Sequence, residues 1–196
     1  MNPFAPFLPI ARQSLTRPRA GAAALLALGV PKPALWPGFF LSIVLTVLMV
    51  EGIAMLDPQT RALPLMIPPI LYVIITSVAM ALWIGLVTRI GRAMGGRGRY
   101  DDFLLMTAFL QVVWLIGQLA GLLVMVAVPL LGALAILGLF VLMIWIHSAY
   151  VAEIHGFPST WTGLAVFALS GLGLVALLFL ALTVLGVGFH GGSPNV

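Results

Sequence analysis

The sequence predicts an all-α integral membrane protein with five transmembrane helices. Of its 196 residues, 62% are hydrophobic and only 7% are charged, and the mean hydropathy is +1.20. So few charged side chains cannot cover the surface of a soluble domain of this size. The apolar stretches are continuous rather than alternating, which excludes a membrane β-barrel.

Five apolar stretches are long enough to cross about 30 Å of hydrocarbon at about 1.5 Å per residue. We expect the spans at about residues 37–54, 69–88, 103–128, 130–150 and 161–187. The third and fourth spans come from one uncharged stretch, residues 103–146, which is about twice as long as a single span. This stretch must fold as a hairpin, and Pro129 and Gly132 are the strong breakers near its middle.

A Pro-rich arm, residues 1–36, precedes the first span and contains no acidic residue. Its basic residues are Arg12, Arg17, Arg19 and Lys32. The run 17–29 begins with Arg17-Pro18 and ends at Gly29, which is typical of a short helix. It is too short to span a membrane, so we expect an interfacial helix with its arginines toward anionic headgroups. A disordered arm is the alternative.

The loop charges predict the orientation. Four basic residues lie in the arm, four in the connection 89–99, and one, Arg61, in the connection after the first span. A cytoplasmic N-terminus places eight of the nine basic residues inside, as the positive-inside rule requires. The membrane domain then covers residues 37–188, and residues 189–196 form a short external tail.

The connection 88–102 is the most polar part of the chain. Gly95, Gly96 and Gly98 would leave backbone amides accessible beside arginines, a pattern that suits phosphate. A nucleotide loop is disfavoured because no strand precedes it and no Lys-Ser or Lys-Thr follows. We therefore expect contact with anionic headgroups, or docking of a protein partner, with Asp101 and Asp102 capping the third span. The expected contact residues are Arg92, Arg97 and Arg99, with Arg17 and Arg19 of the arm.

A second polar group contains His147, Glu153 and His155. Two imidazoles and a carboxylate could hold a metal or relay a proton, but offsets of six and eight residues turn Glu153 and His155 about 240° and 80° from His147 on a helix. We therefore expect no metal site. Instead, His155 should help to end the helix of the fourth span beside Gly156, and Pro158 should lie in the first turn of the next helix. Glu153 should pair with an arginine of the connection 88–102.

Polar side chains also follow one face of the third span. Thr107, Gln111 and Gln118 lie at helical spacing, and Gly117 and Gly121 form a Gly-x-x-x-Gly pattern. Amides in hydrocarbon need partners, so this face should point into the bundle or toward another subunit. It serves either helix packing or a polar path for a substrate.

Three stretches carry a resemblance to a known family. They are residues 16–36, which include Thr16-Arg17-Pro18-Arg19 and Pro31-Lys32-Pro33; residues 95–102, Gly-Gly-Arg-Gly-Arg-Tyr-Asp-Asp; and residues 151–157, Val-Ala-Glu-Ile-His-Gly-Phe. In their order and spacing they resemble a bacterial member of the Ypt-interacting-protein (Yip) family. The resemblance implies a five-helix domain with a cytoplasmic N-terminus in the bacterial cytoplasmic (inner) membrane. Eukaryotic relatives bind Rab-type GTPases, but their Asp-Leu-Tyr-Gly-Pro signature is absent here, so that activity is not carried over.

These observations predict a non-enzymatic membrane protein of the Yip type that organises membranes or binds a partner. The expected partners are the bilayer, through anionic headgroups, and a protein or a second copy of the chain. We expect no nucleic acid, cofactor or metal, and the chain shows no convincing nucleophile or pair of carboxylates for catalysis. The alternative is a small transporter or channel subunit that uses the polar face of the third span.

Overall fold

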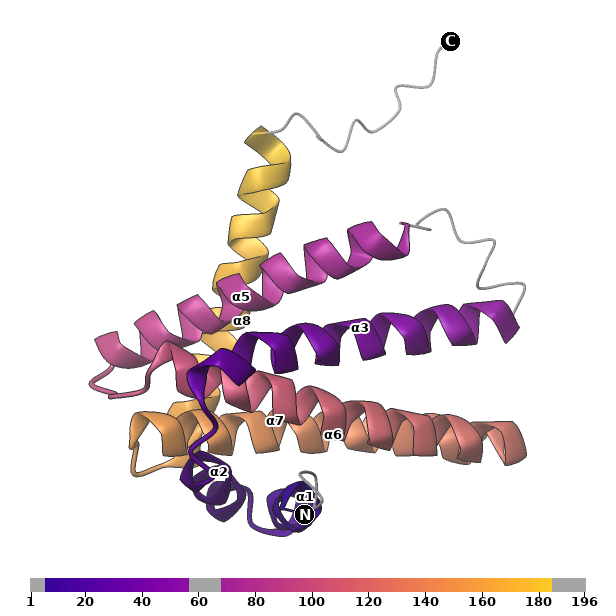
Figure 1. The fold of residues 1–196 in the computed structure, drawn as a ribbon, viewed down its shortest axis with the longest axis horizontal. Coiled ribbons are helices and arrows are strands. Elements are labelled where there is room, and N and C mark those ends of the chain that lie inside the picture. Colours follow the sequence, from indigo (N-terminus) through magenta and orange to yellow (C-terminus); the bar gives the residue numbers. More distant parts are fainter. Residues whose placement is uncertain (1–5, 57–67, 185–196) are drawn as a thin grey trace.

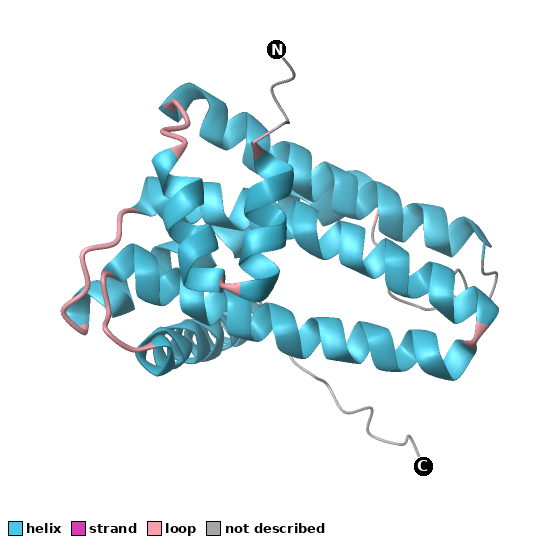
Figure 2. Cartoon of the chain, turned by 90° about the horizontal axis from the view of Figure 1, so that it is seen from below, coloured by secondary structure: helices cyan, strands magenta, loops and turns pink. Residues whose placement is uncertain are grey.

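A computed structural model describes residues 6–56 and 68–184, and within these ranges the chain is entirely helical (Figures 1 and 2). The helices are α1 (Phe7–Thr16), α2 (Pro18–Ala27), α3 (Lys32–Leu56), α5 (Pro69–Ala93), α6 (Tyr100–Ala127), α7 (Pro129–His155) and α8 (Thr160–Val184). Five of them, α3 and α5 to α8, are long and apolar enough to cross a membrane. The predicted fold class is confirmed. The connection that contains Arg61, residues 185–187 of the expected fifth span and the tail 189–196 lie outside the described residues.

Several of the long helices extend beyond the expected spans. Helix α3 begins at Lys32 and contains Pro37; this proline lies in its second turn, where it interrupts only the start of the hydrogen-bond ladder. Helix α5 continues through Arg89 to Ala93, because basic side chains are favourable beside the negative end of the helix dipole. An arginine therefore does not mark the end of this helix.

The hairpin of α6 and α7 turns where the breakers predict. Val128 alone separates the two helices, and Pro129 is the first residue of α7. One turn later, Gly132 lies directly against the backbone of Met125, where a side chain would overlap. This close approach lets the two helices leave the turn in contact.

The long helices gather around a core that lies toward one end of the bundle. Helix α6 packs against α7 and α3, and α5 lies beside α3 (Figure 1). Helix α8 crosses α5 and α7 steeply, and its C-terminal half projects away from the other helices. The largest buried side chains include Phe39, Phe103, Ile146, Tyr150 and His155. We call this end, where α5 and α7 end and α3, α6 and α8 begin, the basic end; it carries Arg19, Lys32, Arg92, Arg97 and Arg99.

The arm is folded and contains one helix more than the sequence suggests. Helix α2 matches the expected run 17–29, but α1 was not expected, because three prolines within the first nine residues indicate an irregular chain. Pro9 lies in the first turn of α1, where proline is tolerated. The Ser14 and Tyr150 hydroxyls hydrogen bond at 2.7 Å and join α1 to α7. The alternative of a disordered arm is therefore wrong for residues 7–27.

Candidate functional site at the basic end

His155, the last residue of α7, is the centre of the basic end. Its side chain is 2% exposed and lies against three glycines: Gly91 of α5, and Gly96 and Gly98 of the connection to α6. A Cβ atom at any of these glycines would overlap the imidazole. The rings of Phe103 and Phe157 lie beside it, with centroid distances of 4.9 and 5.2 Å. The glycines therefore serve to bring the backbone onto this ring.

Backbone hydrogen bonds fix the protonation of the imidazole. The Gly98 N–H donates to Nδ1 at 3.1 Å, so Nδ1 accepts and the ring proton lies on Nε2. Nε2 in turn donates to the Val87 carbonyl at 3.2 Å. Both nitrogens of this neutral ring are thus occupied, which leaves no lone pair for a metal ion.

The same contacts use the amides of the glycine-rich connection. The Gly96 N–H donates to the Gly91 carbonyl at 2.8 Å, and the Arg97 N–H donates to the His155 carbonyl at 3.0 Å. Together with Gly98, three consecutive amides point into the protein rather than toward a ligand. The idea of a phosphate-binding glycine loop is therefore wrong. The connection between α5 and α6 therefore meets the end of α7 at His155.

Glu153 makes an ion pair, but not with the expected connection. Its carboxylate accepts from Arg19 Nε at 2.9 Å. The other guanidinium nitrogens of Arg19 donate to the carbonyls of Phe157 and Pro158 at 2.8 and 2.9 Å. Arg19 thus joins α2 to the connection between α7 and α8. Sequence spacing could not show this, because the arm was expected to lie on the membrane and not on α7.

The end of α7 confirms one expectation and corrects another. Gly156 adopts the left-handed conformation at φ +73°, and its N–H donates to a carbonyl of the last turn, so it caps α7 beside His155 as predicted. Pro158 does not begin α8, which starts at Thr160. The carbonyl of Pro158 is instead held by Arg19, so this residue lies in the connection.

The two aspartates at the start of α6 have separate roles. Asp102 accepts from the Arg99 N–H at 3.3 Å, which is the capping role predicted for it. Asp101 pairs with Lys32 Nζ at 2.8 Å and so links α3 to α6. Glu153 and Asp101 thus hold Arg19 and Lys32, whereas Arg92 and Arg97 make no ion pair among the described residues.

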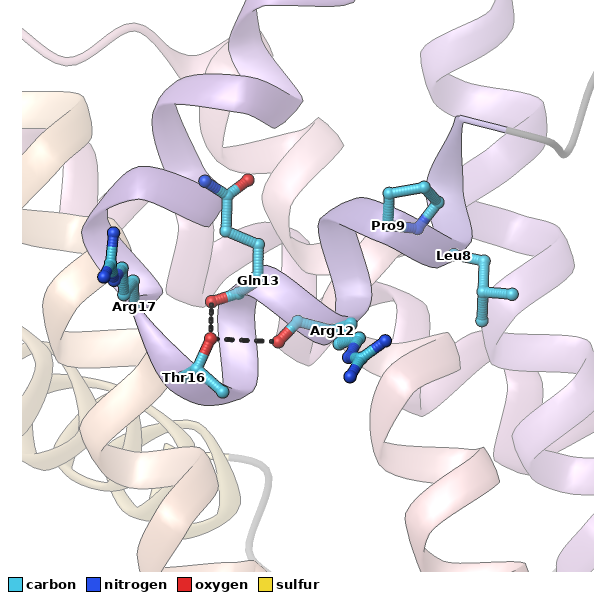
Figure 3. A pocket seen from close by; sticks show the side chains of 6 residues that line it. All are labelled: Leu8, Pro9, Arg12, Gln13, Thr16 and Arg17. Atoms are coloured by element: carbon cyan, nitrogen blue, oxygen red, sulfur yellow. Dashed lines mark hydrogen bonds between the residues drawn. The ribbon is translucent and has the colours of Figure 1, made fainter.

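The remaining arginines are exposed. Arg92 donates through Nε to the Gly98 carbonyl at 3.0 Å, which holds its guanidinium over the connection. The side chains of Arg97 and Arg99 are exposed. The Arg99 guanidinium makes one long ion pair, with Asp101 at 3.9 Å. The outer face of α1 adds Arg12 and Arg17 around an open groove of about 740 Å³, which Leu8, Pro9, Gln13 and Thr16 complete (Figure 3).

His147 does not belong to this cluster. Its Nδ1 lies 2.7 Å from the carbonyl of Met143 in the preceding turn, and its ring packs against Trp83 and Phe167. Across residues 6–56 and 68–184, no group of three His, Asp or Glu side chains is arranged to hold a metal ion.

The polar face of α6 makes contacts between helices. Gln111 donates to the Thr46 hydroxyl of α3 at 2.9 Å, and Thr107 donates to the carbonyl of Phe103 in its own helix. Gln118 is half-buried. Gly117 and Gly121 lie against Leu139 and Ile136 of α7, which is the close approach that their spacing predicts.

Sequence reasoning missed several residues of the basic end. Gly91 looked like an ordinary helical glycine, and Ser14 lay in a segment with no predicted structure. Each gains its role from a residue at least 64 positions away in sequence: Gly91 from His155, and Ser14 from Tyr150. The small residue at Gly91, one turn after a buried Val87, was the one local signal for close packing.

The five long apolar helices define an integral membrane protein of the all-α class. A family model described as the Yip1 domain matches residues 12–182, and the chain therefore belongs to the Yip1 domain family. The match includes α2, all of α3 and α5 to α7, and α8 except its last two residues. This agrees with the resemblance found in the three sequence stretches. No curated protein and no solved structure matches the chain.

Proposed function

We propose that this Yip1-domain protein is a non-enzymatic component that organises the bacterial cytoplasmic membrane, with its N-terminus and basic end in the cytoplasm. The arginines of the basic end contact anionic lipid headgroups there, and a protein partner that carries acidic groups can use the same surface. The contact residues are Arg92, Arg97 and Arg99, with Arg17 on the arm. Arg19 belongs to the expected set by sequence, but its donors are used by Glu153 and two carbonyls.

One observation supports this proposal above the others. The connection 94–99 is fixed by the bonds of Arg97 and Gly98 to His155, while the side chains of Arg97 and Arg99 remain exposed. A fixed backbone with free cationic side chains can meet phosphate groups without first ordering the loop. The acids Glu153 and Asp101 pair with Arg19 and Lys32, and Arg99 lies 3.9 Å from Asp101. Arg92 and Arg97 make no ion pair among the described residues.

The test is the paired substitution Arg97→Ala with Arg99→Ala. Each arginine near an anionic surface contributes about 1 kcal/mol, so the pair contributes about 2 kcal/mol, or roughly 30-fold in affinity. We expect the delipidated variant to bind anionic phospholipid by about this factor more weakly, as measured by native mass spectrometry. Binding of a zwitterionic phospholipid should change little.

The matched control is Arg97→Lys with Arg99→Lys, which keeps the charge and should keep most of the anionic-lipid binding. Crosslinking in native membranes tests the partner. If the alanine variant retains both anionic-lipid binding and every crosslinked protein of the wild type, the proposal is wrong.

The transporter alternative has no comparable support. Gln111, the central side chain of the polar face, is bonded to Thr46 across α3 and α6. This contact accounts for a polar face by helix packing alone, and we propose no second function.

A further inference from the structure

The connection 94–99, between α5 and α6, is held against the end of α7 by two bonds to one residue. The Gly98 N–H donates to Nδ1 of His155 at 3.1 Å, and the Arg97 N–H donates to the His155 carbonyl at 3.0 Å. We call the form that contains both bonds the closed form. Its geometry depends on an imidazole nitrogen that must accept a hydrogen bond.

Only a neutral imidazole can hold Gly98 in this way. Nδ1 accepts through its lone pair, while Nε2 donates to the Val87 carbonyl at 3.2 Å. A proton on Nδ1 would turn this acceptor into a donor, so that two N–H groups would face each other. The protonated ring has two donors and no acceptor, so turning the ring over does not restore the bond to Gly98.

The ring cannot avoid this conflict by moving within the closed form. It is 2% exposed, and it lies between the rings of Phe103 and Phe157 and the backbone of three glycines. A positive charge in such an apolar, closely packed place is costly. Gly91 and Phe103 belong to long helices, so the connection that carries Gly96 and Gly98 is the part of this cover that can move without shifting a helix.

The charged groups around the ring do not offset a charge on it. The Arg92 guanidinium of α5 is close enough to repel a charged imidazole, and Arg89, Arg97 and Arg99 have exposed side chains. The acids of the neighbouring helices serve other partners. Asp101 and Glu153 form ion pairs with Lys32 and Arg19, and Asp102 caps the start of α6.

We propose that His155 is an acid-sensitive switch, and that protonation of its imidazole releases the connection 94–99 from the end of α7. In the open form the ring reaches water, where the pKa of an imidazole is about 6.5. The open form therefore takes up a proton below this pH, whereas the closed form must lose the bond to Gly98 to do so. Because the open form binds more protons, acidification below about pH 6.5 shifts the equilibrium toward it.

Hydrogen exchange of the backbone amides tests this switch. The full-length protein in lipid nanodiscs is labelled with deuterium between pH 7.5 and 5.5, and labelling times are scaled to the intrinsic exchange rate at each pH. We expect the protection of the Arg97 and Gly98 amides to fall by up to about tenfold at pH 5.5, one unit below the pKa of a free imidazole. A peptide from the opposite turn, residues 122–132, should keep its protection.

Two variants assign the response to one histidine. The side-chain oxygen of His155→Asn can accept from Gly98 but takes up no proton in this range, so its amide protection should not change with pH, whatever its level at pH 7.5. His147→Asn is the matched control, because His147 lies away from the connection, beside Trp83 and Phe167. This variant should keep the response of the wild type.

A second measurement needs no variant. Exchange of the imidazole C2–H with deuterium, mapped by mass spectrometry, follows the protonation of each histidine in the wild type. We expect His155 to titrate over the same pH range in which the Arg97 and Gly98 amides lose protection. Unchanged amide protection in the wild type, an equal loss in His155→Asn, or a His155 titration in a different pH range would overturn the proposal.

The switch is independent of the proposed function, although it acts on the connection that carries Arg97 and Arg99. Both bonds to His155 come from backbone amides, so Arg97→Ala with Arg99→Ala should keep the pH response. Loss of the anionic-lipid contact and loss of the switch can therefore be told apart.

Discussion

His155 shows how one residue can order two connections. Its imidazole accepts from Gly98 and donates to Val87, and its carbonyl accepts from Arg97. The ring therefore provides the Gly98 N–H and the Val87 carbonyl with hydrogen-bond partners in place of water. This is a structural role for a histidine at a membrane edge, and it depends on the three glycines around the ring.

We expect Gly98→Ala to lower the stability, because Gly98 is one of the three glycines packed against the His155 ring. A Cβ atom there would lie 2.7 Å from Phe103 and 2.8 Å from His155 Nδ1, so the ring or the connection must move. Overpacking of this kind costs about 1–3 kcal/mol, and we expect Tm in detergent to fall by several degrees. The measurement is thermal unfolding followed by the exposure of buried aromatic residues.

Gly138→Ala is the control for this substitution, because nothing lies within 4 Å of a Cβ atom at that position in α7. Alanine favours a helix over glycine, so its Tm should stay equal or rise slightly. Equal Tm values for Gly98→Ala and the wild type would contradict the close packing of Gly98 against His155.

Among the helices, the sequence predicts the long apolar ones much better than the arm. Continuous hydrophobicity fixes the number of spans, and the breakers at Pro129 and Gly132 place the hairpin turn. Helices α3 and α5 extend about one turn beyond the expected spans, because a charged residue does not by itself end a helix. Helix α1 was missed because its stability comes from packing against α7, through Ser14 and Tyr150, and not from a local pattern.

The candidate site was predictable in its location but not in its pairing. The basic loop and the segment 151–157 were expected on the same side, and they meet at His155. Which arginine reaches Glu153 depends on where α2 rests, and this is set by contacts distant in sequence. The role of the glycines was also hidden, because a glycine that admits a ligand and a glycine that admits a neighbouring ring look the same in sequence.

The docking of α2 predicts a different effect for two arginines of the arm. Arg19→Ala removes an ion pair and two hydrogen bonds to carbonyls. The side chain is partly exposed, so we expect a loss of about 1–2 kcal/mol. The released arm should also be cut faster by protease, which limited proteolysis measures.

Arg17→Ala is the matched control, since the Arg17 side chain is exposed on the same arm and should change stability by less than about 0.5 kcal/mol. Arg19→Lys should rescue only part of the loss, because an ammonium group cannot serve the carboxylate and both carbonyls with the geometry of a guanidinium. If both alanine variants resist protease like the wild type, the contacts of Arg19 do not hold the arm against the end of α7.

For the whole molecule, the testable property is its orientation. The chain contains no cysteine, so a single introduced cysteine can be labelled without a background. We expect Ser159→Cys, at the basic end, to be protected from a membrane-impermeant maleimide in intact cells. Val128→Cys, at the opposite turn between α6 and α7, should be labelled.

Permeabilised cells provide the control, because both cysteines should then react. The reverse pattern in intact cells would place the basic end outside, against the distribution of arginines. It would also remove the proposed cytoplasmic contact with anionic headgroups.

The contact of Gly98 with His155 also implies an order of assembly. The two residues are 57 positions apart, so the connection between α5 and α6 is synthesised well before its histidine. Until α7 is in place, the amides of Arg97 and Gly98 lack their partners on His155. These two bonds therefore require that α7 has packed beside α5. Their formation reports that the α6–α7 hairpin is complete.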